Sequence, residues 1–280
     1  MRIEGQSSNV EDRRGMGRGG LIGGGIGTLV LVVVGLFFGI DPRVILGMAE
    51  TAQTVQQTQA PQGPAKAPTD AEGQFVSGVL LDTEKTWNTL FQQLGRKYNN
   101  ARVVIFDGGA TRTACGTGQS AMGPFYCPLD QSVYIDLSFY KALQQKFKAP
   151  GDTAQAYVIA HEVGHHVQNQ LGIMEKVQAM RQRASEAQAN QLSVRLELQA
   201  DCFAGVWAHH ANNRKLLEAG DVEEAMRAAA AVGDDNIQRR TQGQIVPESF
   251  THGSSEQRMR WFMTGMKSGQ ITACNTFEGV

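Results

Sequence analysis

The chain carries almost no net charge. Its 280 residues include 26 lysines and arginines against 27 acidic residues, which gives a formal net charge of −1. Domains that bind nucleic acid present a basic surface to the phosphate backbone, and this balance gives no electrostatic basis for one. We therefore expect no nucleic-acid partner. The length admits one large domain or two small ones, and the chain has no internal repeat.

Cysteine is scarce as well. The chain has four cysteines, and none of them shows the C-x-x-C spacing that is typical of structural zinc sites and redox motifs. An even number of cysteines is compatible with two disulfides if the compartment is oxidising.

Charged residues are absent from the stretch LIGGGIGTLVLVVVGLFFGI, residues 21–40. Such a stretch is long enough to span a bilayer as a helix. Arg13, Arg14 and Arg18 precede it, so the positive-inside rule keeps residues 1–20 in the cytoplasm as a tail and exports the remainder. A cleaved signal peptide is the alternative, but its apolar core would be shorter and followed by a small-residue cleavage site. We predict an uncleaved transmembrane anchor.

Large apolar side chains are rare in TAQTVQQTQAPQGPAKAPTD, residues 51–70, which is rich in glutamine, threonine, alanine and proline. This composition is typical of a flexible or semi-extended linker. We place the linker at residues 41–71 and one folded domain at residues 72–280.

Hydrophobic periodicity predicts a domain that is mostly helical, with a small sheet. Residues 107–124 and 240–254 are expected to be loops. The strand over 132–139 is expected at the edge of the sheet, where it would align a bound peptide. The other predicted elements are helices over 70–95, 153–171 and 254–269, and a strand over 101–107.

Histidine is rare, with six in the chain, yet three lie in YVIAHEVGHHVQNQLG, residues 157–172. On a helix, His161 and His165 present both imidazoles on one face, with Glu162 on its flank, while His166 points away. The pattern H-E-x-x-H binds zinc through its two histidines, and its glutamate acts on a water molecule. A chance match on a buried helix is the alternative, and a third ligand would decide between the two.

The chain lacks the extended pattern H-E-x-x-H-x-x-G-x-x-H, because Gln168 and Leu171 occupy its last two defined positions. A later helical stretch, LELQADCFAGVW, supplies Glu197 and Asp201 on one face of an otherwise apolar segment. Glu197 can complete a three-ligand metal site, and Asp201 can accept the other ring N–H of a zinc-binding histidine. A solvated acidic face, with Arg195 nearby, is the alternative.

These residues resemble the site of the glutamate-zincin metallopeptidases. Four segments are more similar still to a bacterial family of neutral zinc metallopeptidases: GPFYCPLDQSVYID, HEVGHHVQNQLG, LELQADCFAGVW and VPESFTHGSSEQRMRWF. The resemblance covers nearly the whole chain. It implies a zincin-like fold, Zn²⁺ as the cofactor and hydrolysis of peptide bonds, and it names no substrate.

His252 lies in THGSSEQRMRW, which resembles the T-H-P-x-x-x-x-R segment of membrane-associated zinc peptidases of the heat-shock and prenyl-protein-processing type. There the histidine lies across the site from the metal. This chain has Gly253 in place of the proline, and an ordinary loop histidine is the alternative. Tyr126, Tyr134 and Tyr157 are further candidates for a donor to the oxyanion.

Four cysteines allow three pairings. We favour Cys115–Cys127, which would bracket the glycine-rich loop, and Cys202–Cys274, which would tie the C-terminal tail to the helix that carries Asp201.

The sequence therefore predicts an α+β, zincin-like metallopeptidase domain preceded by one transmembrane helix. We expect a zinc-dependent endopeptidase on the periplasmic or extracytoplasmic side of the bacterial inner membrane, with a peptide or protein as its substrate. Zinc would be held by His161, His165 and Glu197, and Glu162 would be the general base. Alternatives are a catalytically silent zinc-binding module that recruits partners at the membrane, against which the intact Glu162 argues, and a hydrolase of non-peptide amides.

Overall fold

The computed structural model describes residues 1–15, 66–107, 109–120 and 123–278. Its strands form a four-stranded sheet in the order β1–β2–β6–β5 and a separate two-stranded hairpin, β3–β4. β1, β2 and β6 run parallel, whereas β5 runs antiparallel to β6 and forms an edge. The strands are β1 (Val10–Asp12), β2 (Arg102–Phe106), β3 (Ala110–Thr113), β4 (Gly116–Gln119), β5 (Phe125–Cys127) and β6 (Ser132–Asp136).

The two faces of this sheet pack against different cores. Val103 and Ile105 of β2 belong to the main hydrophobic core, whereas Val104 and Phe106 belong to a smaller cluster with Phe125. Successive side chains of a strand point to opposite faces, so a central strand that is covered on both sides is apolar throughout. This is why β2 is the unbroken run RVVIF rather than an alternating one.

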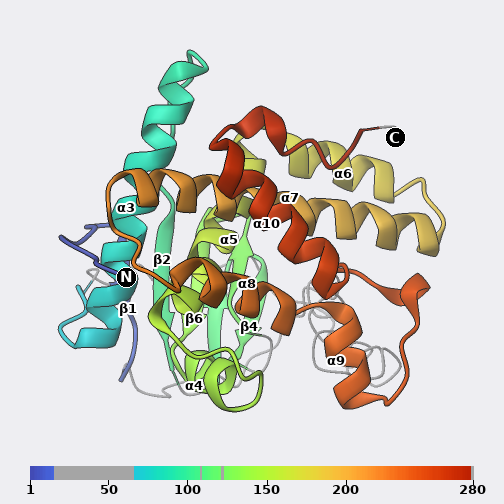
Figure 1. Ribbon diagram of the computed structural model, residues 1–280, viewed down its shortest axis with the longest axis horizontal. Helices are drawn as coiled ribbons and strands as arrows, with labels where there is room; N and C mark the ends of the chain where they lie inside the picture. Colours follow the sequence, from blue (N-terminus) through green and yellow to red (C-terminus); the bar gives the residue numbers. More distant parts are fainter. Residues whose placement is uncertain (16–65, 108, 121–122, 279–280) are drawn as a thin grey trace.

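Helices make up most of the remaining structure, and α5 lies at their centre. It contacts α3, β5 and β6 as well as α6, α7 and α8, while α10 runs across α7 and α8 (Figure 1). The helices are α3 (Ala71–Gln93), α4 (Ser138–Gln145), α5 (Asp152–Gln170), α6 (Ile173–Arg181), α7 (Glu186–Asn213), α8 (Asp221–Ala231), α9 (Asp234–Thr241) and α10 (Ser255–Ser268), with 3-10 turns η3 (Pro247–Ser249) and η4 (Ile271–Ala273).

Glycines allow α7 and α10 to pack unusually closely. A Cβ atom at Gly205 of α7 would lie 2.0 Å from the carbonyl oxygen of Phe262. A Cβ atom at Gly265 of α10 would lie 1.9 Å from the carbonyl oxygen of Cys202. No side chain fits at either position, so the contact between these two helices requires both glycines.

Local signals located the helices well. α3, α5 and α10 match the predicted ranges to within a residue or two, and Ser254 caps α10 in a capping box with Gln257. Gly172 adopts φ 74°, the left-handed conformation that commonly follows the end of a helix. Both favoured disulfides are present, Cys115–Cys127 and Cys202–Cys274.

Two predictions about strands were wrong. The strand predicted over 132–139 ends at Asp136, and it lies between β2 and β5 instead of at the edge of the sheet. The edge beside it is β5. The predicted loop over 107–124 contains the hairpin β3–β4, which short polar and glycine-rich strands form without a hydrophobic signature.

The predicted fold class also requires correction. The structure is α+β with a small sheet, but the transmembrane helix predicted over residues 21–40 lies outside the described residues. Among the helices that the structure describes, none is long and apolar enough to cross a membrane. The membrane anchor in our prediction is therefore unsupported, and the predicted linker over 41–71 also lies largely outside the described residues.

The predicted localisation, a single-pass inner-membrane protein with a cytoplasmic tail, is corrected for the same reason and for a second one. β1 pairs with β2, so residues 10–12 extend the sheet of the domain. Ser7 and Asn9 bond the carboxylate of Glu84 on α3, at 2.7 Å each. The first residues of the chain thus belong to the same folded unit as the domain, which contradicts a tail on the opposite side of a membrane.

Candidate active site

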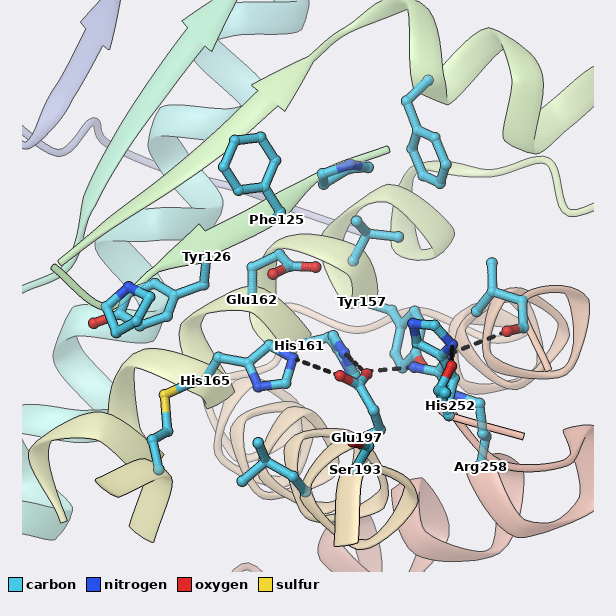
Figure 2. Close-up of a pocket in the computed structure, with 18 of the residues that line it drawn as sticks. Phe125, Tyr126, Tyr157, His161, Glu162, His165, Ser193, Glu197, His252 and Arg258 are labelled. Carbon is cyan, nitrogen blue, oxygen red and sulfur yellow. Dashed lines mark hydrogen bonds and ion pairs between the residues drawn. The ribbon is translucent and has the colours of Figure 1, made fainter. Parts of the chain in front are cut away.

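Two helices bring the predicted ligand residues together. α5 contributes His161 and His165, α7 contributes Glu197, and one ligand atom from each lies within 4.8 Å of the others. Glu197 Oε2 is 3.2 Å from His161 Nε2, and its Oε1 is 3.5 Å from His165 Nε2. Figure 2 shows these three side chains converging, with Glu162 on the side that faces Phe125. We refer to His161, His165 and Glu197 as the ligand cluster.

The close approach of α5 and α7 at this point depends on Gly164. A Cβ atom there would lie 3.0 Å from the carbonyl oxygen of Ala200 and 3.2 Å from its Cα atom, both on α7. Both neighbouring atoms belong to the backbone of α7, which cannot change rotamer to relieve a short contact as a side chain can. A larger residue at position 164 would therefore push Glu197 away from the two histidines.

His161 is held by a buried charged network. Its Nδ1 lies 2.9 Å from Asp201 Oδ1, and the fully buried Asp201 also accepts hydrogen bonds from Tyr157 and from Arg258, the latter at 2.8 and 2.9 Å. Burial alone would raise the pKa of Asp201, but Arg258 and His161 keep it lowered. The contact of Nδ1 with an ionised carboxylate fixes the ring orientation in which Nε2 faces Glu197.

His165 is held by neutral amides instead. The side-chain nitrogen of Gln168 donates to the carbonyl oxygen of Leu196 at 2.7 Å and to Gln199 Oε1 at 3.1 Å. This leaves Gln168 Oε1 as the acceptor for His165 Nδ1 at 2.9 Å. Gln199 in turn donates to the carbonyl oxygen of Cys274 at 2.9 Å. This chain of amides holds the ring of His165 so that its Nε2 faces Glu197.

The ligand cluster favours a bound cation. Burial would lower the pKa of His161, but Asp201 and Glu197 raise it to about 9. Burial would also lower the pKa of His165, and Glu197 raises it above its usual value. Burial would raise the pKa of Glu197, yet His165 and His161 hold it well below its usual range. The attraction that retains a proton here would equally favour a metal cation in its place.

The donor set fits zinc. Two imidazole nitrogens and one carboxylate oxygen form one of the three-ligand sets of catalytic zinc sites, which leave a fourth position open. Both histidines have an acceptor on Nδ1, so loss of the proton from Nε2 would free its lone pair for a metal. His161, His165 and the two acceptors Asp201 and Gln168 are buried, so packing as well as hydrogen bonding restricts both rings.

Glu162 is buried beside the ligand cluster, at 8% exposure, and its carboxylate has no hydrogen bond or ion pair with any residue in the described part of the chain. Burial raises its pKa, against the opposing charges of His165 and His161. Glu162 thus differs from Asp201, which is fully committed to partners. A carboxylate that no hydrogen bond or ion pair holds can accept and release a proton.

Asp234 of α9 holds the loop that carries His252. Its Oδ2 accepts the backbone N–H groups of Thr251, His252 and Gly253 at 2.8, 2.6 and 2.9 Å, and its Oδ1 lies 3.2 Å from His252 Nδ1. Gly253 has φ 94° and donates its N–H, and proline can do neither. This explains why glycine stands where the resembling peptidases have proline.

His252 is buried and lines the same cavity as the ligand cluster. Burial would lower its pKa, but Asp234 raises it. The three tyrosines that were alternative oxyanion donors are engaged elsewhere. Tyr126 contacts His166 Nδ1 at 3.0 Å, Tyr134 donates to an Asp130 oxygen at 2.7 Å, and Tyr157 donates to Asp201.

A cavity of about 300 Å³ opens over the ligand cluster. The edge strand β5 lines one side of it with Phe125 and Tyr126, and α6 contributes Met174, Gln178 and Arg181. Much of the remaining wall is apolar. The site is therefore a groove with a polar floor beside the edge strand β5, a shape that suits an extended chain.

Sequence reasoning missed three residues that organise this site. Arg258 occupies the final position of the T-H-P-x-x-x-x-R pattern, so that resemblance could have pointed to it. Gln168 follows His165 by three positions, which places it one helical turn away and within reach. Asp234 had no sequence signal, because its partners lie far along the chain.

The chain is similar to known proteins over almost its whole length. A family model described as "Putative neutral zinc metallopeptidase" matches residues 1–277. The chain is 49% identical to the uncharacterized protein YpfJ of Escherichia coli strain K12 over 97% of this chain and 96% of that protein. It is 40% identical to the uncharacterized protein Rv2575 of Mycobacterium tuberculosis over 73% of this chain and 71% of that protein. No solved structure matches the chain.

The family match spans almost the entire chain, including the N-terminal residues that pair with the sheet. The chain belongs to the neutral zinc metallopeptidase family, for which Zn²⁺ is the cofactor and a peptide the substrate.

Proposed function

We propose that this protein is a zinc-dependent endopeptidase in which His161, His165 and Glu197 hold the metal. The observation that carries the proposal is the convergence of these three donors from two helices, within 4.8 Å, beside an uncommitted buried carboxylate. Zinc in a site of this kind lowers the pKa of its water ligand to about 7 and polarises the carbonyl group of the scissile peptide bond.

Glu162 is the general base in this proposal. Its carboxylate faces the cavity without a competing partner, so it can take the proton of the attacking water and pass it to the leaving amine. Burial raises its pKa, which suits a group that must both accept and release a proton. Asp201 and Arg258 keep His161 oriented during this transfer.

His252 is the proposed donor to the oxyanion. It lies in the same cavity, and Asp234 fixes both its backbone and its ring. A rigidly held donor costs no reorganisation when negative charge develops on the former carbonyl oxygen. The competing tyrosine hydroxyls are occupied, which favours His252.

β5 is the proposed site of peptide alignment, in place of β6. It is an edge strand that borders the cavity, so a peptide can pair with its free backbone groups and place a carbonyl over the ligand cluster. N-methylation of single backbone nitrogens along a cleaved peptide should abolish cleavage at alternate positions. Equal cleavage of every methylated peptide would exclude strand pairing.

The roles are separated by three variants of the full chain, analysed for zinc content and for hydrolysis of a peptide library. Wild-type protein should hold about one zinc ion per chain, and His161→Ala should lose it. Glu162→Gln should keep zinc and the fold while hydrolysis falls by orders of magnitude. His252→Ala should keep zinc while turnover falls about 100- to 1,000-fold with little change in KM.

Three results would contradict these assignments. Full zinc content in His161→Ala would remove it from the ligand set. Undiminished hydrolysis by Glu162→Gln would exclude it as the base. Loss of zinc from His252→Ala would make that residue a ligand or a structural element instead of an oxyanion donor.

A further inference from the structure

Arg181 has no carboxylate partner among the residues that the structure describes. It is the last residue of α6 and is half-buried, and its Nε atom is buried with no hydrogen-bond partner among the described residues. Burial lowers its pKa, and no carboxylate opposes that effect. Burying a guanidinium N–H costs free energy unless an acceptor compensates, so the position of Nε needs an explanation.

Other arginines in the fold show the usual arrangement. Arg258 donates two hydrogen bonds to Asp201, and Arg214 donates to both carboxylate oxygens of Asp82 at 2.8 and 2.7 Å. Each of these guanidinium groups meets a buried carboxylate from another helix. Arg181 has no such partner within the described chain, although its Nε atom is buried.

Arg181 faces the cavity of the candidate active site. Met174, Gln178 and Arg181 are spaced four and three positions apart on α6, so they share one helical face, and all three line the cavity. α6 follows α5 directly after Gly172 and packs against α7, so this face lies over the two helices that carry the ligand cluster.

The arginines in the cavity lining are Arg181 and Arg258. Arg258 is committed to Asp201, which leaves Arg181 to meet a charge on a substrate. The carboxylates of Glu162 and Glu197 repel an acidic substrate group, and Arg181 lies in the same cavity, where its positive charge offsets that repulsion. A guanidinium group is suited to this task because its planar fork pairs with a carboxylate through two parallel hydrogen bonds.

We propose that Arg181 binds a carboxylate of the peptide substrate and makes the protein selective for cleavage near an acidic group. The group is either an Asp or Glu side chain close to the scissile bond or the free C-terminal carboxylate of a short peptide. This inference rests on the proposed peptidase function and names the substrate class within it.

The first test measures kcat/KM for matched peptides and the wild-type full chain. In one series, each position around the cleaved bond in turn carries either glutamine or glutamate. A second series compares peptides that have a free C-terminus with the same peptides amidated. A charge-assisted pair is expected to favour the carboxylate peptide by about 10- to 100-fold at one position or at the C-terminus. The series in which this occurs identifies the source of the carboxylate. No preference in either series would overturn the inference.

Variants then assign the preference to Arg181. Arg181→Met should bring the ratio of kcat/KM for carboxylate and amide peptides close to one, and Arg181→Glu should reverse it in favour of a lysine-containing peptide. Arg183→Met and Arg183→Glu are matched controls, since Arg183 is an exposed arginine two positions away that does not line the cavity. A ratio that is unchanged in Arg181→Met, or lowered equally in the Arg183 controls, would assign the preference elsewhere.

Measurements of peptide binding test the role of Arg181 independently of the proposed peptidase function. Glu162→Gln protein, loaded with zinc, should bind the fluorescent carboxylate peptide about 10- to 100-fold more tightly than its amide counterpart, and adding Arg181→Met should remove the difference. Peptide binding with this dependence on Arg181, but no hydrolysis by wild-type protein, would refute the peptidase function alone. Hydrolysis without any dependence on Arg181 would refute the inference alone. Circular dichroism of each variant confirms that the fold is retained.

Discussion

The two histidines of the ligand cluster differ in the charge of the groups that hold them. His161 rests on the buried ion pair of Asp201 and Arg258, whereas His165 rests on Gln168, a neutral amide. A carboxylate makes an imidazole more basic and a stronger ligand, but a buried charge depends on its partner. A neutral amide fixes the orientation of the ring at a lower energetic cost. The comparison predicts that the two sides of the site respond differently to mutation.

Removal of Arg258 should have the largest effect. Arg258→Met leaves Asp201 buried without its counter-charge, and breaking a buried pair in this way typically destabilises a protein by about 3 to 5 kcal/mol. The free energy of unfolding, measured by urea denaturation with the disulfides intact, should fall by that amount. Arg260→Met on the same helix is the control, since an exposed arginine should change stability by less than about 0.5 kcal/mol.

The double variant Asp201→Asn/Arg258→Met sharpens this prediction. Removing both charges leaves no uncompensated ion, so the double variant should be less destabilised than the sum of the single variants. Equal small losses in Arg258→Met and Arg260→Met would show that the ion pair contributes little to folding.

Asp201→Asn should have the next largest effect. We expect it to lower the affinity for zinc and not only the free energy of unfolding. The asparagine oxygen can still accept from His161 Nδ1, but the negative charge that strengthens the ligand is lost. Changes to the groups that orient a metal ligand typically weaken metal binding about 10- to 100-fold, or roughly 1.4 to 2.7 kcal/mol. Competition with a chromophoric chelator measures this, and unaltered zinc affinity would contradict the role of the charged network.

Gln168→Met should have the smallest effect of the three. It removes the acceptor on His165 Nδ1 but no charge, so we expect zinc affinity to fall by about tenfold or less, the lower end of the same range. The same chelator competition provides the comparison. A loss larger than that of Asp201→Asn would invert the ranking and show that orientation matters more than charge at this site.

The sequence predicted the helices better than the strands. α5 and α10 begin and end close to their predicted limits, because caps and periodicity act within a few residues. β6 was recognised as a strand but misplaced at the edge of the sheet, since its neighbours come from distant segments. The membrane anchor was inferred from the uncharged stretch 21–40 and the arginines that precede it, and neither feature indicated that residues 10–12 join the sheet of the domain.

The sequence by itself determined the identity and spacing of His161, Glu162 and His165, because positions one and four apart on a helix have a fixed geometry. Only the tertiary structure decided how Glu197 reaches them, since that depends on the backbone contact at Gly164. The pairing of Asp201 with Arg258 and the position of β5 at the edge of the sheet were likewise decided by packing between distant segments. Local geometry follows from neighbouring residues, whereas an approach between two elements depends on every side chain that lies between them.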